Sequence, residues 1–335
     1  MARIHFLNVE EGDCSIIEHD NGHVTMIDVC SAQQPLEEIA KGQQTFSDSS
    51  ESLKIPMGNY HQKYNPENPV TYLQKLKIRT IFRYIQTHPD MDHMDGLQYI
   101  DANFKIINFW DTANNKEQDF EGCSKYDEKD WECYQELRKS TNNPVSLNYY
   151  DGSTAKYFAE DDNGRKQDDY LQILAPTKQL IKGANESGDW NDSSYVILYH
   201  IHGFKVLFCG DAGNGTWGHI MTNHVNDIKN IDVMIAPHHG RKGTLDFSFL
   251  DVSCPQVTLI GNALSKYLAY DQWNNRNLLH FTNNQAGNIE IEFSGQTMKM
   301  YCSNKIFATG FALKNKQKGI NKSLCDNWSL LTIVK

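Results

Sequence analysis

Residues 88–93 read His-Pro-Asp-Met-Asp-His and follow directly on the apolar run Ile-Phe-Arg-Tyr-Ile at residues 81–85. The stretch places four candidate metal ligands, His88, Asp90, Asp92 and His93, within six residues. The apolar run predicts a strand, and a strand end can direct several side chains at one point. Imidazoles and carboxylates clustered in this way are typical of hydrolases that use two metal ions, although a polar loop rich in Asp and His is the simpler alternative.

Two later segments have the same arrangement, in which an apolar strand ends in an acidic or imidazole side chain. They are residues 207–211 (Leu-Phe-Cys-Gly-Asp) and 235–239 (Ile-Ala-Pro-His-His). Strand ends on one side of a layered fold can converge, and one carboxylate can bridge two cations about 3.5–4 Å apart. We expect Asp211 to be that bridge. With these two segments, the ordinary-loop interpretation of residues 88–93 becomes the weaker one.

Composition and charge restrict the function classes. The chain has 335 residues and a formal net charge of −10, which argues against tight binding of long nucleic acids but not against their cleavage at a metal site. The eight cysteines form no Cys-x-x-Cys pair and are expected to be small core side chains. No apolar stretch approaches the length of a membrane helix or a signal peptide, so we expect a cytoplasmic location and no membrane partner. The oligomeric state is not predictable from these data.

The order of predicted elements favours one hydrolase domain over residues 1–302. Three strands open the chain, the first of them half-buried, and Asn21-Gly22 forms a hairpin turn between the second and third. A second hairpin is expected over residues 195–209, and a helix begins at about Gly218. Residues 32–68 read as a long loop or insertion, and residues 303–335 as a tail that packs on the domain or extends it.

Several motifs, taken together, resemble those of metallo-β-lactamase-fold hydrolases, and more narrowly the hydrolase domain of the ComEC competence family. They occur in that family's order over most of the chain, from residue 3 to about residue 295. The matching segments are residues 6–13 (Phe-Leu-Asn-Val-Glu-Glu-Gly-Asp), 26–28 (Met-Ile-Asp), 88–96, 191–196 (Asn-Asp-Ser-Ser-Tyr-Val), 207–211 and 237–242 (Pro-His-His-Gly-Arg-Lys).

The resemblance implies an αββα sandwich of two mixed sheets flanked by helices, with the site at one edge of the sheets. It implies two divalent metal ions, Mn²⁺ or Zn²⁺, and a hydroxide bridging them as nucleophile. His88, Asp90 and Asp211 would hold one ion, and Asp92, His93, Asp211 and His238 the other. His238 is preferred over His239 as the ligand, and His239 is given a neighbouring or substrate role. Catalytic roles are expected for Asp92, which would orient the nucleophile, for His239 and for Lys242, which would stabilise developing negative charge.

The chain departs from the wider superfamily at informative positions. Asp90 stands where most members have a histidine, and extra oxygen ligands make manganese a competitor to zinc. The usual third histidine is missing, and Asn191, Asp192 or Ser194 could instead complete the first ion's shell or bind substrate. The membrane segments of a DNA-uptake channel are absent, so transport is not expected.

Other polar residues are given structural interpretations. Asp13 and Asp28 both end early strands near the expected metal edge, but a turn-stabilising role is preferred for each over a role at the site. His200 and His202 flank a hairpin turn, and His219 and His224, five apart on a predicted helix, should not share a face.

The function predicted from the sequence is a metal-dependent phosphodiesterase or nuclease, acting on nucleic acid or a small nucleotide-type substrate. The alternatives are a lactonase, thioesterase or lactamase, and a non-catalytic interaction module on the same fold. Ser-His-Asp catalysis is discounted because no nucleophile elbow is found.

Overall fold

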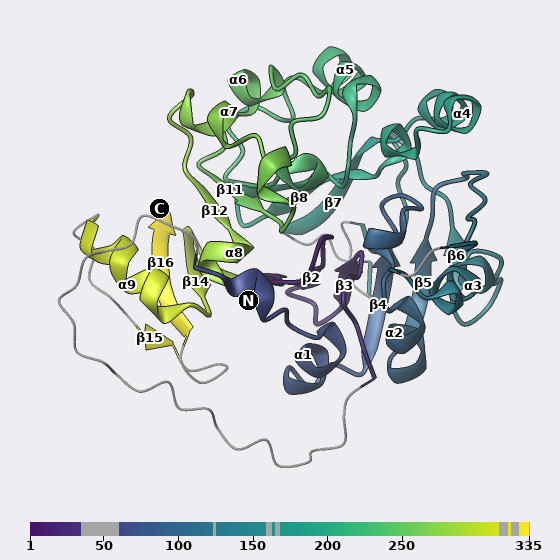
Figure 1. Cartoon of the computed structure of the whole chain (residues 1–335), viewed down its shortest axis with the longest axis horizontal. Coiled ribbons are helices and arrows are strands. Elements are labelled where there is room, and N and C mark those ends of the chain that lie inside the picture. The colour runs from purple at the N-terminus through teal and green to yellow at the C-terminus, as the bar shows by residue number, and fades with distance from the viewer. Residues whose placement is uncertain are drawn as a thin grey trace.

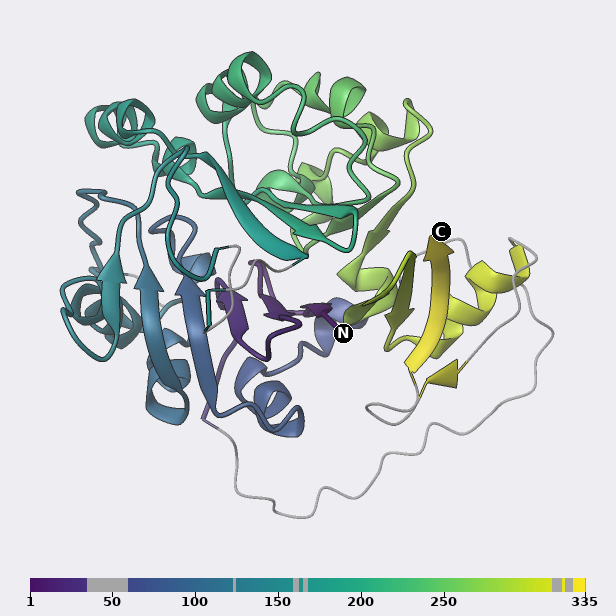
Figure 2. The same cartoon turned by 180° about the vertical axis from the view of Figure 1, so that it is seen from behind.

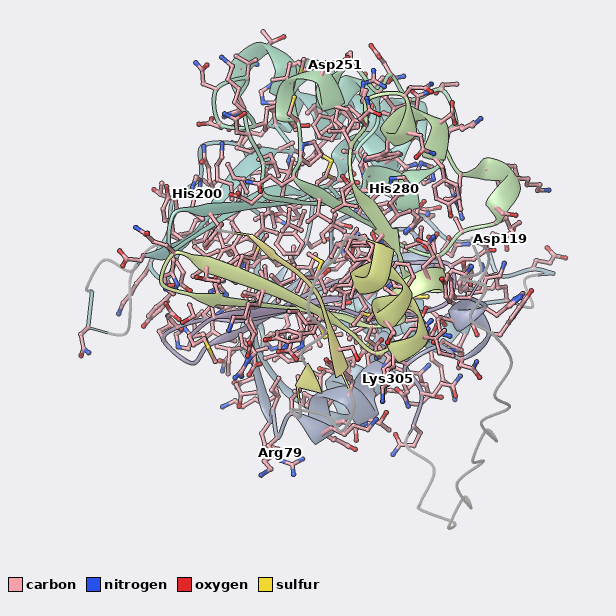
Figure 3. All side chains as sticks on the ribbon, turned by 90° about the vertical axis from the view of Figure 1, so that its left-hand side faces the viewer. Arg79, Asp119, His200, Asp251, His280 and Lys305 are labelled. Carbon is pink, nitrogen blue, oxygen red and sulfur yellow. The ribbon has the colours of Figure 1, made fainter. Side chains whose placement is uncertain are left out.

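Two mixed β-sheets pack face to face, and helices cover the outer face of each sheet (Figure 1). The computed structural model describes residues 1–34, 60–122, 125–158, 163–164, 168–314, 321–322 and 328–334. The αββα sandwich expected from the sequence is confirmed. In the side view of Figure 3, Asp251 in the helical layer on the smaller sheet lies at the top, and Arg79, directly before β4 (Thr80–Ile85) of the larger sheet, lies at the bottom.

The larger sheet combines the N-terminal strands with strands from the C-terminal part of the chain. Its order is β15-β16-β14-β13-β1-β2-β3-β4-β5-β6, antiparallel from β15 to β3 and parallel from β3 to β6. Figure 2 shows β4, β5 and β6 in blue, side by side, with their arrowheads toward the same edge. The strands are β1 (Arg3–Phe6), β2 (Ser15–Glu18), β3 (Val24–Ile27), β4 (Thr80–Ile85), β5 (Lys105–Trp110), β6 (Val145–Leu147), β13 (Ile289–Ser294), β14 (Thr297–Cys302), β15 (Asn321–Lys322) and β16 (Trp328–Val334).

The smaller sheet has the order β12-β11-β10-β9-β8-β7, with an antiparallel half (β7 to β9) and a parallel half (β9 to β12). Its strands are β7 (Asp169–Ala175), β8 (Val196–Ile201), β9 (Phe204–Phe208), β10 (Val233–Ile235), β11 (Val257–Ile260) and β12 (His280–Thr282). The β8–β9 hairpin expected from the sequence is therefore present.

Helices α1, α2 and α3 cover the larger sheet, and α5, α6 and α7 cover the smaller one (Figure 1). The helices are α1 (Pro69–Lys75), α2 (Leu97–Asn103), α3 (Glu128–Leu137), α4 (Lys178–Ser187), α5 (Asn214–Asn223), α6 (Phe249–Ser253), α7 (Tyr270–Asn274), α8 (Asn283–Ala286) and α9 (Lys305–Lys314). Short 3₁₀ turns are η1 (Gln62–Tyr64), η2 (Met91–His93), η3 (Trp190–Ser193), η4 (Pro237–Gly240) and η5 (Ser265–Tyr267). None of the helices among the described residues is long and apolar enough to cross a bilayer.

The core lies between the sheets and continues beneath the helices. Ile197 and Tyr199 of β8 face the inter-sheet core, whereas Val196 and Leu198 face the helices of the smaller sheet. A strand that is covered on both faces favours apolar residues at successive positions, which explains the hydrophobic run at residues 196–199 of β8.

Two local expectations change in the structure. The first strand is not half-buried, because His5 is fully buried beneath α1 and contacts Tyr72 Oη (2.9 Å) and Glu18 Oε1 (3.0 Å). Helix α5 begins at Asn214 instead of about Gly218. Most of the predicted loop 32–68 (residues 35–59) lies outside the described residues. After residue 302, the chain forms helix α9 and adds strands β15 and β16 to the larger sheet, as expected for a tail that extends the domain.

Candidate metal centre

The ends of strands β4, β9 and β10 bring the three ligand-rich segments to one edge of the sandwich. His88 and η2 follow β4, Asp211 follows β9, and the His238-His239 pair lies in η4 after β10. The parallel pairing of β9 with β10 aligns the carboxyl ends of these two strands. The sequence segments that resembled a metal site are therefore neighbours in space.

Asp211 lies at the centre of the cluster with its two oxygens facing different groups. On one side, Asp211 Oδ1 is 3.0 Å from His93 Nε2 and 3.6 Å from His239 Nε2. His239 Nε2 also lies 3.8 Å from Asp92 Oδ2 and 3.3 Å from His93 Nε2. Asp92, His93, His239 and Asp211 Oδ1 thus surround one point.

On the other side, Asp211 Oδ2 faces two different imidazoles. It lies 3.9 Å from His88 Nε2 and 3.6 Å from His238 Nε2. His88 Nε2 is in turn 3.7 Å from Asp90 Oδ2. The two sides of Asp211 therefore carry similar sets of nitrogen and oxygen donors.

The two histidines of the pair differ in place and burial. His239 is fully buried and belongs to the Oδ1 side, whereas the His238 side chain is 32% exposed and faces Oδ2. The sequence had preferred His238 as the partner of Asp92 and His93. The geometry puts His239 in that position and His238 beside His88.

Asp28 and Asp13, for which a turn-stabilising role was preferred, lie directly behind the imidazoles. Asp28 Oδ2 is 2.7 Å from His93 Nδ1 and also accepts a hydrogen bond from the Thr87 hydroxyl (2.6 Å). Asp13 Oδ1 lies 3.1 Å from His239 Nδ1, an ion-pair distance without the geometry of a hydrogen bond. A carboxylate on the far nitrogen fixes the ring so that Nε2 points at the metal position. Orienting a histidine was not the expected role of either carboxylate. The hydrogen bonds from Thr87 to Asp28 do fit the expected turn-stabilising role.

Gly12 allows Asp13 to reach this position. A Cβ at residue 12 would lie 2.1 Å from the Asp92 carbonyl oxygen and 2.7 Å from the Cys30 side chain. Any larger residue would push the residue 10–13 segment away from η2. The Gly-Asp motif at the start of the chain is therefore required by close packing against the ligand loop.

Electrostatics keep Asp211 ionised in spite of burial. Burial raises the pKa of Asp211, but His93, His239 and His238 lower it more, so its pKa lies well below the usual range. Burial lowers the pKa of His93, but Asp211 and Asp28 raise it by more, so the pKa lies well above its usual value. The pKa of His238 is lowered, chiefly by burial.

Lys116, which no sequence motif indicated, is the cation nearest to the candidate ligands among the contacts of the described residues. Its Nζ lies 2.6 Å from Asp90 Oδ1 and 5.2 Å from the centre of the Trp190 ring. Lys242, which the sequence had suggested, is more than half exposed and pairs with Asp271 at 3.2 Å. Lys116 belongs to no motif, and nothing local in the sequence marks it.

The segment that replaces the third histidine has structural contacts. Asp192 Oδ1 accepts a hydrogen bond from Thr216 N (3.0 Å) and so fixes the first turn of α5, which explains the early start of that helix. Ser194 Oγ accepts from the Asp211 backbone N–H at 3.3 Å and supports the bridging position. Asn191 contributes its carbonyl oxygen, which accepts from Ser194 N.

The donor set suits divalent cations. His88 Nε2 and Asp211 Oδ1 are buried and have no hydrogen bond of acceptable geometry among the described residues. Buried polar atoms without a partner are costly unless another group satisfies them. The region collects five carboxylates and four imidazoles, an excess of negative charge that two divalent ions would balance: Asp13, Asp28, Asp90, Asp92, Asp211, His88, His93, His238 and His239.

Comparisons with known proteins give likenesses in structure alone. No protein-family model matches the chain, and no curated protein matches its sequence. Similar solved structures include the metallo-β-lactamase fold protein YhfI from Bacillus subtilis (8% identity, TM-score 0.45, 84% of this chain and 96% of that one). Others are a diphosphatase from the PhnP family (9%, 0.44, 88% and 98%) and a mutant of the CmlA β-hydroxylase (11%, 0.48, 87% and 54%). At these identities and TM-scores, the likenesses carry no argument about the chemistry of this chain, which is therefore inferred from its own residues.

Proposed function

We propose that this chain is a metal-dependent hydrolase whose centre holds two divalent cations with Asp211 as their shared ligand. The observation that carries the proposal is the position of Asp211, which directs one oxygen at His93 and His239 and the other at His88 and His238. When bound, such cations would act as Lewis acids and lower the pKa of a water molecule toward neutrality.

The distances favour one assignment of ligands to the two cations. Asp92, His93 and His239 would hold the ion on the Oδ1 side, and His88, Asp90 and His238 the ion on the Oδ2 side. In this arrangement His238 supplies the nitrogen that the missing third histidine provides in related hydrolases. Zinc and manganese both remain suitable, because the set mixes imidazoles with carboxylates.

The residues around the ligands have separate tasks. Asp28 and Asp13 hold His93 and His239 in orientation, and Ser194 holds the Asp211 backbone. Asp92, whose side chain is 20% exposed, is placed to accept a proton from the attacking water.

A phosphodiester is the preferred substrate class. Lys116 presents an ammonium group next to Asp90, where it can pair with a phosphate oxygen. The Trp190 ring beneath it offers a face on which a nucleobase can stack. Together with the resemblance to the ComEC hydrolase domain, these groups support nucleic acid or a small nucleotide-type molecule as substrate.

A substrate panel tests the proposal. Purified protein loaded with Mn²⁺ or Zn²⁺ would be assayed on bis(p-nitrophenyl) phosphate, single-stranded DNA, RNA and cyclic nucleotides, beside a lactone, a thioester and nitrocefin. We expect turnover of phosphodiesters and a loss of at least about 100-fold in the matched Asp211→Ala variant. Faster hydrolysis of the lactone, thioester or nitrocefin would replace the phosphodiesterase assignment. A chain that binds less than one metal equivalent and turns over nothing would be a non-catalytic module.

A further inference from the structure

A second group of metal-ligating side chains lies away from the candidate centre, along the second half of α5. Asp151, which follows β6, contacts two histidines of the smaller sheet's helical layer. Asp151 Oδ2 is 3.0 Å from His219 Nε2, and Asp151 Oδ1 is 2.9 Å from His224 Nε2. The three ligand atoms all lie within 4.8 Å of one another.

Both imidazoles reach Asp151 because α5 ends between them. His219 is the sixth of the ten residues of the helix, which stops at Asn223, and His224 is the C-cap with φ −123° and ψ 19°. The change of backbone direction at residue 224 swings its ring back toward His219, with ring centres 5.7 Å apart. The sequence expectation that residues five apart would not share a face is therefore wrong here.

The far nitrogen of His224 has a carboxylate partner, as is usual for metal-ligating histidines. His224 Nδ1 lies 2.8 Å from Asp227 Oδ2, so the ring lies between the carboxylates of Asp227 and Asp151. His219 Nδ1 lies 3.0 Å from the Asn223 side-chain amide. Asn223 Nδ2 also donates to the His219 carbonyl oxygen (3.0 Å), so the amide acts as a donor toward Nδ1, and a metal on Nε2 would require this side chain to turn.

The setting allows a further ligand and separates this group from the Asp211 centre. The three side chains are each 15–21% exposed, and a cavity of about 850 Å³ is lined by Asp151 and His224. Helix α5 starts three residues after Asp211, and its ten residues span about 15 Å. The Asp151 group thus lies along the second half of α5 and its C-cap, away from the end that follows Asp211.

We propose that Asp151, His219 and His224 form a peripheral site for a divalent transition metal such as Zn²⁺. Two imidazoles and one carboxylate with an open fourth position are a common zinc ligand set, and a water from the cavity completes it. The bound ion joins the segment after β6, from the larger sheet, to α5 on the smaller sheet. Its role is to tie the two halves of the sandwich together at this edge. The site does not depend on the proposed hydrolase function.

Zinc stoichiometry tests the peripheral site. Wild type, His224→Ala, Asp211→Ala and the double variant Asp211→Ala/His224→Ala would be stripped with chelator, reloaded with Zn²⁺, washed and measured by elemental analysis. We expect His224→Ala to lower bound zinc by about one equivalent per chain in both backgrounds. Its effect on hydrolysis should stay within about twofold, since it contacts none of the ligands around Asp211. Unchanged zinc content in both backgrounds would overturn the proposal and leave a hydrogen-bonded Asp–His network.

A conservative variant separates metal binding from folding. Asp151→Asn keeps a hydrogen-bonding group of the same shape but removes the charged ligand. In the Asp211→Ala background, added Zn²⁺ should raise the Tm, and Asp151→Asn should abolish that rise while the Tm in chelator changes little. A zinc-dependent rise that survives in both Asp151→Asn and His224→Ala would contradict the site.

Discussion

Asp28 Oδ2 lies 2.7 Å from His93 Nδ1, and both side chains are almost completely buried. Because a carboxylate accepts here, Nδ1 of His93 carries a proton that points at Asp28, and Nε2 is the nitrogen that faces Asp211. Asp28 adopts a positive φ of 56°, a conformation that is uncommon for a residue other than glycine. The backbone after β3 is therefore held in an unusual shape that aims this carboxylate at the ring.

Asp28→Asn should weaken metal binding and hydrolysis without unfolding the chain. The amide can still accept one hydrogen bond, but it no longer stabilises the oriented imidazole, and we expect a loss of about 10–100-fold in metal affinity or kcat/KM. Metal titration and phosphodiester kinetics on the variant measure this. A lowered Tm with unchanged kcat/KM would return Asp28 to a turn-stabilising role.

His238→Ala and His239→Ala should each remove one cation of the pair. They lie on different sides of Asp211, so each variant is expected to lose about one equivalent of bound metal, while Asp211→Ala weakens both sites. Elemental analysis after equilibrium dialysis distinguishes the variants. If His238→Ala keeps the full metal content and only raises KM, His238 binds substrate instead.

Lys116→Ala should impair phosphodiester hydrolysis far more than Lys242→Ala. Hydrogen bonds to charged groups contribute about 1.5–3 kcal/mol, which corresponds to a loss of roughly 10–150-fold in kcat/KM. Lys242 is paired with Asp271 and more than half exposed, so its loss should matter little. Steady-state kinetics of both variants, with Lys116→Arg as the charge-preserving control, test the difference. Equal defects in the two alanine variants would contradict the assignment.

Asp111 should make stability depend on pH. Burial raises the pKa of Asp111 to about 6, although Arg138 and Tyr134 partly oppose the rise. Because the folded pKa is above the unfolded one, the stabilising contribution is complete at low pH and is lost as the pH rises through about 6.

The measurement is urea unfolding of wild type and Asp111→Asn between pH 4 and pH 7. The free energy of unfolding of wild type, relative to the variant, should fall by about 2 kcal/mol over this range. A constant difference between the two proteins would show that Asp111 titrates in the same way in the folded and unfolded states.

The elements of the fold were largely predictable because their signals are local. Alternation and β-branched runs mark β2, β3, β8 and β9, and Asn21-Gly22 marks the first hairpin turn. The start of α5 was not predictable in this way. It depends on Asp192, which is more than twenty residues earlier in the chain and reaches Thr216 N only after folding.

The candidate ligands were recognisable for the same reason, since each follows an apolar strand within a few residues. The supporting groups were not. Asp13 looked like an ordinary turn residue, and its contact with His239 joins positions more than two hundred residues apart. Lys116 lies in the segment between β5 and α3, and its distance to Asp90 depends on how that segment packs.

The amino-acid sequence alone was enough to predict the layers of the sandwich and to identify the side chains that follow β4, β9 and β10. It could do so because hydrophobic periodicity and short motifs act over a few residues. The division of the imidazoles between the two oxygens of Asp211, the carboxylates behind them and the meeting of His219 with His224 arise when distant segments pack. Angles and distances of a few ångströms decide these contacts, and they are set by how the two sheets and α5 close on one another.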